Sequence, residues 1–155
     1  MGGAINFNKM ERKMAMPTTV ETNKAIALRD FELWNTGNLA IAEETIAAEY
    51  KRYDFDTLHE GRGPEFVKQL VTMYRAAFPD LHLTIEKMIA VDDVVISRWR
   101  ATGTHKGEFQ GLPPTGAATQ TTGVTITGMS NGKITEERVY MDSVALLKAL
   151  GGMPK

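Results

Sequence analysis

A chain of 155 residues, 43% of them hydrophobic, has the size of one domain with a full apolar core. Its formal net charge of −1 argues against nucleic-acid binding, which usually needs a basic surplus. The absence of cysteine excludes disulfides, a thiolate nucleophile and Cys-ligated zinc, and it fits a reducing compartment. The sequence has neither an apolar run long enough to cross a membrane nor a signal-peptide core, so we expect a cytoplasmic protein.

The N-terminal half is predicted to be helical. Residues 1–19 are rich in methionine without a clear period, and we expect them to be an appendage to a single domain over residues 20–152. From Val20 onward, apolar residues recur at helical spacing, which predicts a first helix that ends near Thr36. Two more helices are predicted over residues 39–48 and 64–78. Pro64 suits the first turn of the latter.

The C-terminal half is predicted to be a meander of strands. From Leu81 onward, apolar and polar residues alternate, and Asn131-Gly132 is a strong hairpin signal. Later strands are expected over residues 94–104, 118–129 and 133–141, followed by a short helix over residues 143–150. Because helices come first and strands follow, the sequence predicts an α+β fold with an antiparallel sheet, not a doubly wound parallel one.

Alternation assigns faces to the long strand over residues 94–104. One face carries Val95, Ser97, Trp99, Ala101 and Gly103, and His105 continues that parity. We assign this face to the concave side of the sheet, so that Trp99 is either a core residue or a pocket wall. Arg98 and Arg100 would then face water or a second subunit.

Three residues are candidates for proton transfer. His105 lies at the end of a strand beside a Gly/Pro-rich loop, where it is either a catalyst or a hydrogen-bonded structural residue. Glu137 shares a face with Val139 and Met141, and in a dry pocket its pKa would rise, which suits a general base or acid. The alternative for Glu137 is a rim carboxylate paired with Arg or Lys. Asp142 precedes the last predicted helix and is either its N-cap or part of the site.

Other catalytic motifs are incomplete. Gly61-Arg62-Gly63 lacks the third glycine and the preceding strand of a dinucleotide fingerprint. Neither a phosphate-binding Walker loop nor a nucleophile elbow occurs, and the three histidines lack metal-ligand spacing. The sequence therefore predicts neither a cofactor nor a metal site.

The segment from Gly103 to Gly116, with Gly103-Thr104-His105 and Pro113-Pro114-Thr115-Gly116, closely resembles the matching segment of SnoaL-like polyketide cyclases. These belong to the superfamily of nuclear transport factor 2, ketosteroid isomerase and limonene epoxide hydrolase. Similar stretches occur at both ends of the third predicted helix and in the C-terminal region, so that the resemblance extends from about Val20 to Gly151.

The resemblance implies a cone-shaped α+β barrel whose curved sheet wraps around the N-terminal helices. It also implies a deep pocket for a small apolar ligand or substrate, no metal, no organic cofactor and a homodimer. The Asp that serves the cyclases on the last strand aligns with Val139, and their His aligns near Thr125. Glu137, His105 or Asp142 would have to replace them. The expected pocket-lining residues are Trp34, Tyr53, Met73, Trp99, Phe109, Val139, Tyr140 and Met141.

Three functions are compatible with these features. The first is a cofactor-independent enzyme of cyclase, isomerase or hydrolase type, in which Glu137 is the base and His105 or Tyr53 the donor. The second is a non-catalytic protein that binds a small apolar ligand, which predicts a cavity without inward polar groups. The third is a dimerisation module whose interior is filled by Trp34, Trp99 and methionines.

Overall fold

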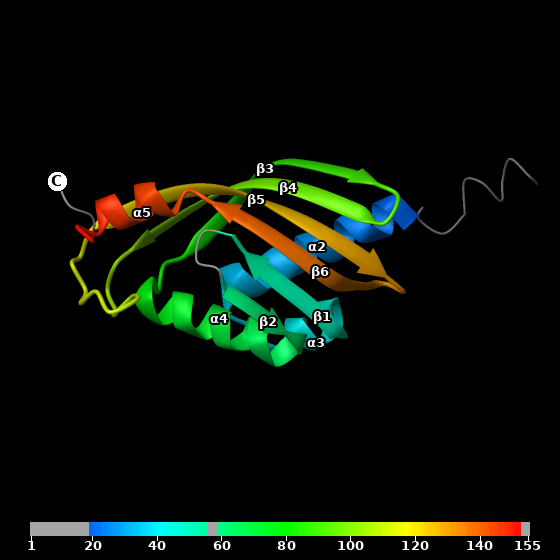
Figure 1. Ribbon diagram of the computed structural model, residues 1–155, viewed down its shortest axis with the longest axis horizontal. Coiled ribbons are helices and arrows are strands. Elements are labelled where there is room, and N and C mark those ends of the chain that lie inside the picture. The colour runs from blue at the N-terminus through cyan, green and yellow to red at the C-terminus, as the bar shows by residue number, and fades with distance from the viewer. Residues whose placement is uncertain (1–18, 56–58, 153–155) are drawn as a thin grey trace, which may run out of the picture.

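The computed structural model describes residues 19–55 and 59–152, so that nearly all of the predicted N-terminal appendage lies outside the described residues. Ten helices and strands follow one another in this part of the chain (Figure 1). They are α2 (Thr19–Thr36), α3 (Ala40–Thr45), β1 (Ile46–Asp54), β2 (His59–Arg62), α4 (Gly63–Ala77), β3 (His82–Val91), β4 (Val94–Thr104), β5 (Ala118–Ser130), β6 (Lys133–Met141) and α5 (Ser143–Ala149).

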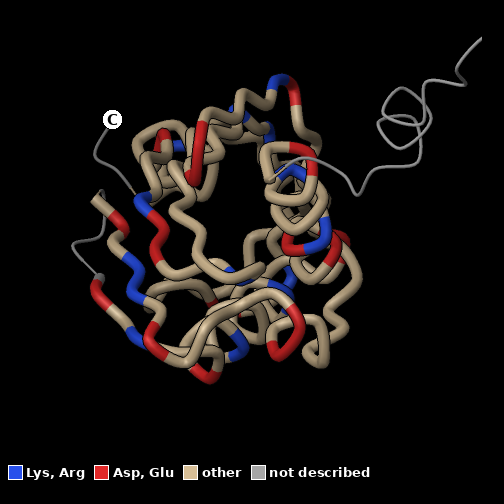
Figure 2. Tube along the Cα trace, turned by 90° about the vertical axis from the view of Figure 1, so that its right-hand side faces the viewer, with Lys and Arg blue, Asp and Glu red and all other residues tan. Residues whose placement is uncertain are grey.

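The strands form one six-stranded sheet in the order β2-β1-β6-β5-β4-β3. The sheet is curved but not closed, and α2, α3 and α4 lie on one side of it (Figure 1). This arrangement confirms the predicted α+β fold and its cone shape. Along the described trace, acidic and basic residues are interspersed rather than gathered by sign (Figure 2).

One strand pair departs from the antiparallel prediction. β1 pairs with β6 in parallel, with Arg52 opposite Glu137, whereas the other neighbouring strands are antiparallel. A parallel pair needs a long crossover, and here α4 and most of the meander separate the two strands along the chain. This pairing brings two charged residues from distant segments onto one inward face.

The predicted helix over residues 39–48 is wrong at its C-terminal end. Helix α3 ends at Thr45, and β1 begins at Ile46 and pairs with β6. The helical spacing of Leu39, Ala42 and Ile46 led to the error, because short apolar runs fit either period. Ile46 and Tyr50 are buried in the core. They reach it because β1 pairs with β6, a strand that lies far along the chain.

The predicted faces of β4 are confirmed. Val95, Ser97 and Trp99 are buried on the concave side, whereas Ile96 and Arg98 are exposed. The register of β4 against β5 is regular along its whole length, so that no bulge exchanges the two faces. In the described part of the chain, none of the helices combines the length and the apolar character required to cross a bilayer.

Candidate functional site

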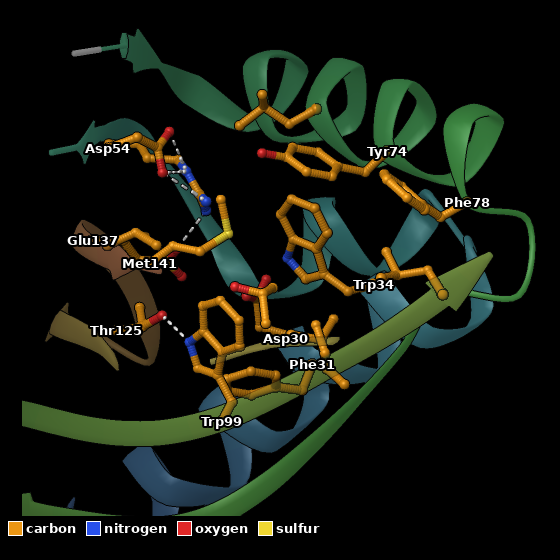
Figure 3. A pocket seen from close by; sticks show the side chains of 18 of the residues that line it. Asp30, Phe31, Trp34, Asp54, Tyr74, Phe78, Trp99, Thr125, Glu137 and Met141 are labelled. Atoms are coloured by element: carbon orange, nitrogen blue, oxygen red, sulfur yellow. Dashed lines mark hydrogen bonds and ion pairs between the residues drawn. The ribbon is translucent and has the colours of Figure 1, made fainter. Parts of the chain in front are cut away.

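A cavity lies between the concave face of the sheet and helices α2, α4 and α5. The cavity volume is about 90 Å³. Most of its wall is apolar, and five aromatic side chains contribute to it (Figure 3): Phe31 and Trp34 from α2, Tyr74 from α4, Phe78 from the end of α4, and Trp99 from β4. The wall therefore suits a small, largely apolar molecule.

The indole of Trp99 is fixed by two features of β5. Its Nε1 donates a hydrogen bond to Thr125 Oγ1 at 2.9 Å. Gly123 leaves room for the ring, because a Cβ at this position would overlap Trp99 and lie 2.7 Å from the carbonyl oxygen of Tyr140. Trp99 is thus a rigid wall of the cavity rather than a side chain that closes it.

Four ionisable residues line one end of the cavity: Asp30 from α2, Arg52 and Asp54 from β1, and Glu137 from β6. Asp54 accepts two hydrogen bonds from Arg52 Nε, at 3.0 and 3.1 Å, and Arg52 Nη2 lies 3.0 Å from Asp54 Oδ1. Arg52 Nη1 donates to Glu137 Oε2 at 3.1 Å (Figure 3). The guanidinium also lies 5.4 Å from the centre of the Trp34 ring.

Asp30 and Glu137 form a coupled pair of carboxyl groups. Both are buried, and they hydrogen-bond each other. Burial raises the pKa of Asp30 well above its ordinary value, and the negative charge of Glu137 raises it further. Burial also raises the pKa of Glu137, against the opposing effects of the Arg52 charge and of hydrogen bonds from Tyr50 and Asp30. Their hydrogen bond raises the pKa of Asp30 and lowers that of Glu137, so that Asp30 is the donor of the pair and Glu137 the acceptor.

Tyr50 stabilises the charged form of Glu137. Its hydroxyl group donates to Glu137 Oε2 at 3.2 Å, and its side chain is fully buried. Burial raises the pKa of Tyr50 well above its ordinary value, and the charge of Glu137 adds to this, so that the phenol keeps its proton. Hydrogen bonds from Tyr50 and Arg52 therefore favour the carboxylate form of Glu137, whereas Asp30 accepts from Thr45 Oγ1 at 3.5 Å.

Five of the residues that the sequence assigned to a site line this cavity. They are Glu137 and the wall residues Trp34, Trp99, Val139 and Met141. Val139, which aligns with the cyclase Asp, is buried and adds only apolar surface. The alternation of Glu137, Val139 and Met141 on β6 placed all three on the inward face, because the strand is regular there.

His105 lies outside the cavity wall, although it is fully buried. Its Nδ1 accepts the backbone N–H of Thr115 at 3.2 Å and lies 3.0 Å from Thr115 Oγ1. The ring packs on Phe78 with centroids 5.6 Å apart, and Nε2 has no partner among the described residues. His105 anchors the Gly/Pro-rich loop, which corrects its placement in the site.

Asp142 is an N-cap. Its Oδ1 accepts the backbone N–H of Ala145 at 3.0 Å at the start of α5, and it is exposed. The sequence offered this alternative, and the geometry supports it.

Four predicted wall residues lie elsewhere, so their assignment is corrected. Tyr140 is 45% exposed on the outer face of β6, where it stacks on Phe55. Tyr53 shares this outer parity and packs against Arg138. Met73 is exposed on α4, because its side chain points away from the sheet. Phe109 is buried behind the wall, against Phe78 and Tyr74.

Sequence analysis did not find Asp30, Arg52 or Asp54. A signal for Asp30 existed: it lies three residues after Ala27 and four before Trp34, within the apolar stripe of a helix. A carboxylate in such a stripe is unusual and points to a buried site. Arg52 and Asp54 could not be placed, since β1 itself was not predicted. In the ranges that the structure describes, no group of three or more His, Asp or Glu side chains is arranged to hold a metal ion.

Comparisons with known proteins agree with this fold. The sequence model of the SnoaL-like polyketide cyclase family matches residues 25–150. AclR from Streptomyces galilaeus, described as "a putative hydroxylase", is 29% identical over 88% of this chain and 89% of its own, with a TM-score of 0.77. IdmH from Streptomyces antibioticus, described as "a putative polyketide cyclase", is 28% identical over 83% and 98%, with a TM-score of 0.74.

A SnoaL-like protein from Jannaschia sp. CCS1 is 23% identical over 90% of this chain and 99% of its own, and its TM-score of 0.80 shows the same fold. No match was found among curated proteins. The family match and the similar structures confirm the resemblance inferred from the sequence.

Proposed function

The chain belongs to the SnoaL-like polyketide cyclase family, and on this premise we propose that it is a cofactor-independent acid–base enzyme with Asp30 and Glu137 as its catalytic pair. The substrate would be a small, largely apolar carbonyl compound. The reaction would be of cyclase or isomerase type and begin with removal of a proton next to the carbonyl group.

One observation carries this proposal. Two buried carboxyl groups, both with raised pKa, lie within hydrogen-bonding reach of each other inside a cavity with aromatic walls. A carboxylic acid beside a carboxylate supplies a proton donor and a proton acceptor at the same pH. The raised pKa of Glu137 makes its carboxylate a stronger base than a carboxylate in water, and the raised pKa of Asp30 keeps this side chain protonated as a donor.

In the proposed first step, the Glu137 carboxylate takes a proton from the carbon next to the substrate carbonyl. Asp30 gives its proton to the carbonyl oxygen, on which negative charge develops, so that an enol forms. The proton on Glu137 then passes to Asp30 through their shared hydrogen bond, which restores the pair. In a cyclase, the enol carbon would next attack a second carbonyl carbon of the same molecule, with the enol O–H proton passing to Glu137 and the Asp30 proton passing to the new alkoxide, which becomes an alcohol.

This assignment keeps the base that the sequence suggested and changes the donor. The sequence suggested His105 or Tyr53 as the proton donor. However, His105 anchors a loop, and Tyr53 lies on the outer face of the sheet. Asp30 lines the cavity and is hydrogen-bonded to Glu137. Arg52 and Tyr50 would bind and orient Glu137 without exchanging protons themselves.

A non-catalytic binding protein is the rival function. It predicts a cavity without inward polar groups, and two inward carboxyl groups within hydrogen-bonding reach weigh against it. A dimerisation module with a filled interior has less support, because Trp34 and Trp99 contribute to the wall of a cavity. The predicted homodimer stays a prediction, which light scattering coupled to size-exclusion chromatography would test.

The proposed function can be tested without the natural substrate. A bicyclic aryl ketone such as α-tetralone serves as a probe, and ¹H NMR in D₂O measures exchange of its α-protons. We expect the protein to accelerate exchange, and we expect Glu137→Gln and Asp30→Asn each to reduce the acceleration by roughly 10²- to 10⁴-fold.

Glu136→Gln is the matched control, because Glu136 precedes Glu137 on β6 and pairs with Arg138 rather than with the cavity residues. It should exchange like the parent protein. If neither cavity variant lowers the exchange rate below that of Glu136→Gln, the carboxyl pair is not catalytic. Binding of the ketone without exchange would instead favour the binding protein.

A further inference from the structure

Asp54 lines the same end of the cavity as Asp30 and Glu137, but the proposed reaction gives it no role. Its carboxylate binds Arg52 along one edge of the guanidinium, through Nε at 3.0 and 3.1 Å and Nη2 at 3.0 Å. Both side chains are almost completely buried, at 12% and 9% exposure. Such a bidentate pair, shielded from water, is among the stronger and more directional contacts in proteins.

This contact determines how Arg52 meets Glu137. The guanidinium is a planar fork whose N–H groups have fixed directions. With Nε and Nη2 turned to Asp54, Arg52 contacts Glu137 through Nη1, at 3.1 Å. Asp54 also balances the positive charge of Arg52, so that less of that charge acts on the carboxyl pair.

The remaining titratable groups around the pair are phenols. Tyr50 from β1 donates to Glu137, and Tyr74 from α4 lines the cavity. The described elements packed around the pair are α2, α4, β1 and β6. Among their residues that line the cavity, Arg52 is the cation that faces the pair. Whether Asp30 and Glu137 together keep a proton depends on how strongly this cation acts on them.

We propose that Asp54 is a positioning residue that keeps the shared proton on Asp30 and Glu137 by neutralising Arg52 and restricting it to one contact with Glu137. Without Asp54, the guanidinium would be free to bind Glu137 along its edge, and its full charge would favour the doubly ionised pair. The acid needed for catalysis would then be lost at a lower pH than in the parent protein. This inference rests on the proposed function for its catalytic meaning, but the position of the proton can be measured by itself.

The test is Asp54→Asn, which keeps the shape of the side chain and removes its charge. In protein labelled with ¹³C at the Asp and Glu carboxyl carbons, NMR follows the titration of the pair. We expect the midpoint for loss of the shared proton to fall by roughly 1 to 3 pH units, the usual effect of an unbalanced cation beside a carboxyl group. Asp54→Glu, which restores a carboxylate, should recover most of the shift.

Glu136→Gln is again the control, since it removes an Arg-paired carboxylate on the outer face of β6. Its midpoint should equal that of the parent protein. A folded Asp54→Asn protein whose midpoint is unchanged or higher would overturn the inference, and so would an equal fall in Glu136→Gln.

A measurement on the unmodified protein keeps the inference testable if Asp54→Asn does not fold. The ¹⁵N resonance of Arg52 Nε should stay constant through the titration of the pair, because Asp54 retains this N–H. A resonance that moves with the midpoint would show that Arg52 follows the pair instead, and would refute the positioning role. Ketone exchange plays no part in these titrations, so the proposed function and this inference can fail separately.

Discussion

Replacing Asp30 with Asn should change how the stability of the fold depends on pH. Asn has the shape of a protonated Asp, can donate to Glu137 and cannot ionise. In the parent protein, burial and the charge of Glu137 hold the pKa of Asp30 well above its ordinary value. A group with a raised folded pKa stabilises the fold below its unfolded pKa, and this contribution is lost as the pH rises toward the folded value.

The magnitude follows from the one proton that the pair retains. Above the unfolded Asp value of about 3.9, the unfolded chain has released this proton and the folded chain has not. The free energy of unfolding should then fall by about 1.4 kcal/mol per pH unit through this group. Over two pH units in which the folded chain keeps this proton, the loss is about 2.7 kcal/mol.

Urea unfolding at constant ionic strength measures this effect directly. Asp30→Asn should lack that part of the slope and become the more stable protein as the pH rises. We expect its exchange activity to fall at the same time, a trade-off common at active sites. Glu136→Gln should run parallel to the parent protein. If the stability difference between Asp30→Asn and the parent is the same at every pH, Asp30 does not carry a retained proton, and the coupled pair would have to be abandoned.

Three further substitutions test the walls and the cap. Gly123→Ala should displace the Trp99 indole, since a Cβ there has no room; we expect weaker ketone binding, seen as reduced tryptophan quenching, and unchanged quenching would refute the rigid wall. Thr125→Val leaves Trp99 Nε1 without its acceptor and should lower the free energy of unfolding by about 1 to 3 kcal/mol in urea titrations; a neutral result would mean that water replaces the hydroxyl. Asp142→Ala should cost about 1 kcal/mol through loss of the cap to Ala145 and leave ketone exchange intact, whereas loss of exchange would return Asp142 to the catalytic machinery.

The sequence by itself determined the features that depend on local periodicity. The face of β4 that carries Trp99 and the face of β6 that carries Glu137 and Val139 were predicted correctly, because side chains alternate along a regular strand whatever lies around it. The family was also identifiable from short stretches such as Gly103 to Gly116, since the family model matches the chain over residues 25–150.

Tertiary structure decided which residues lie together in the cavity. Asp30 comes from the first described helix and Glu137 from the last strand, and only the folding of the sheet around that helix makes them neighbours. Strand β1 was missed because its parallel partner β6 lies far along the chain, and Arg52 and Asp54 were missed with it. The elevated pKa of Asp30 likewise has no local cause: it arises from burial and from a charge supplied by a distant segment, so that a helical pattern could place this carboxylate on an apolar face but could not show what it faces.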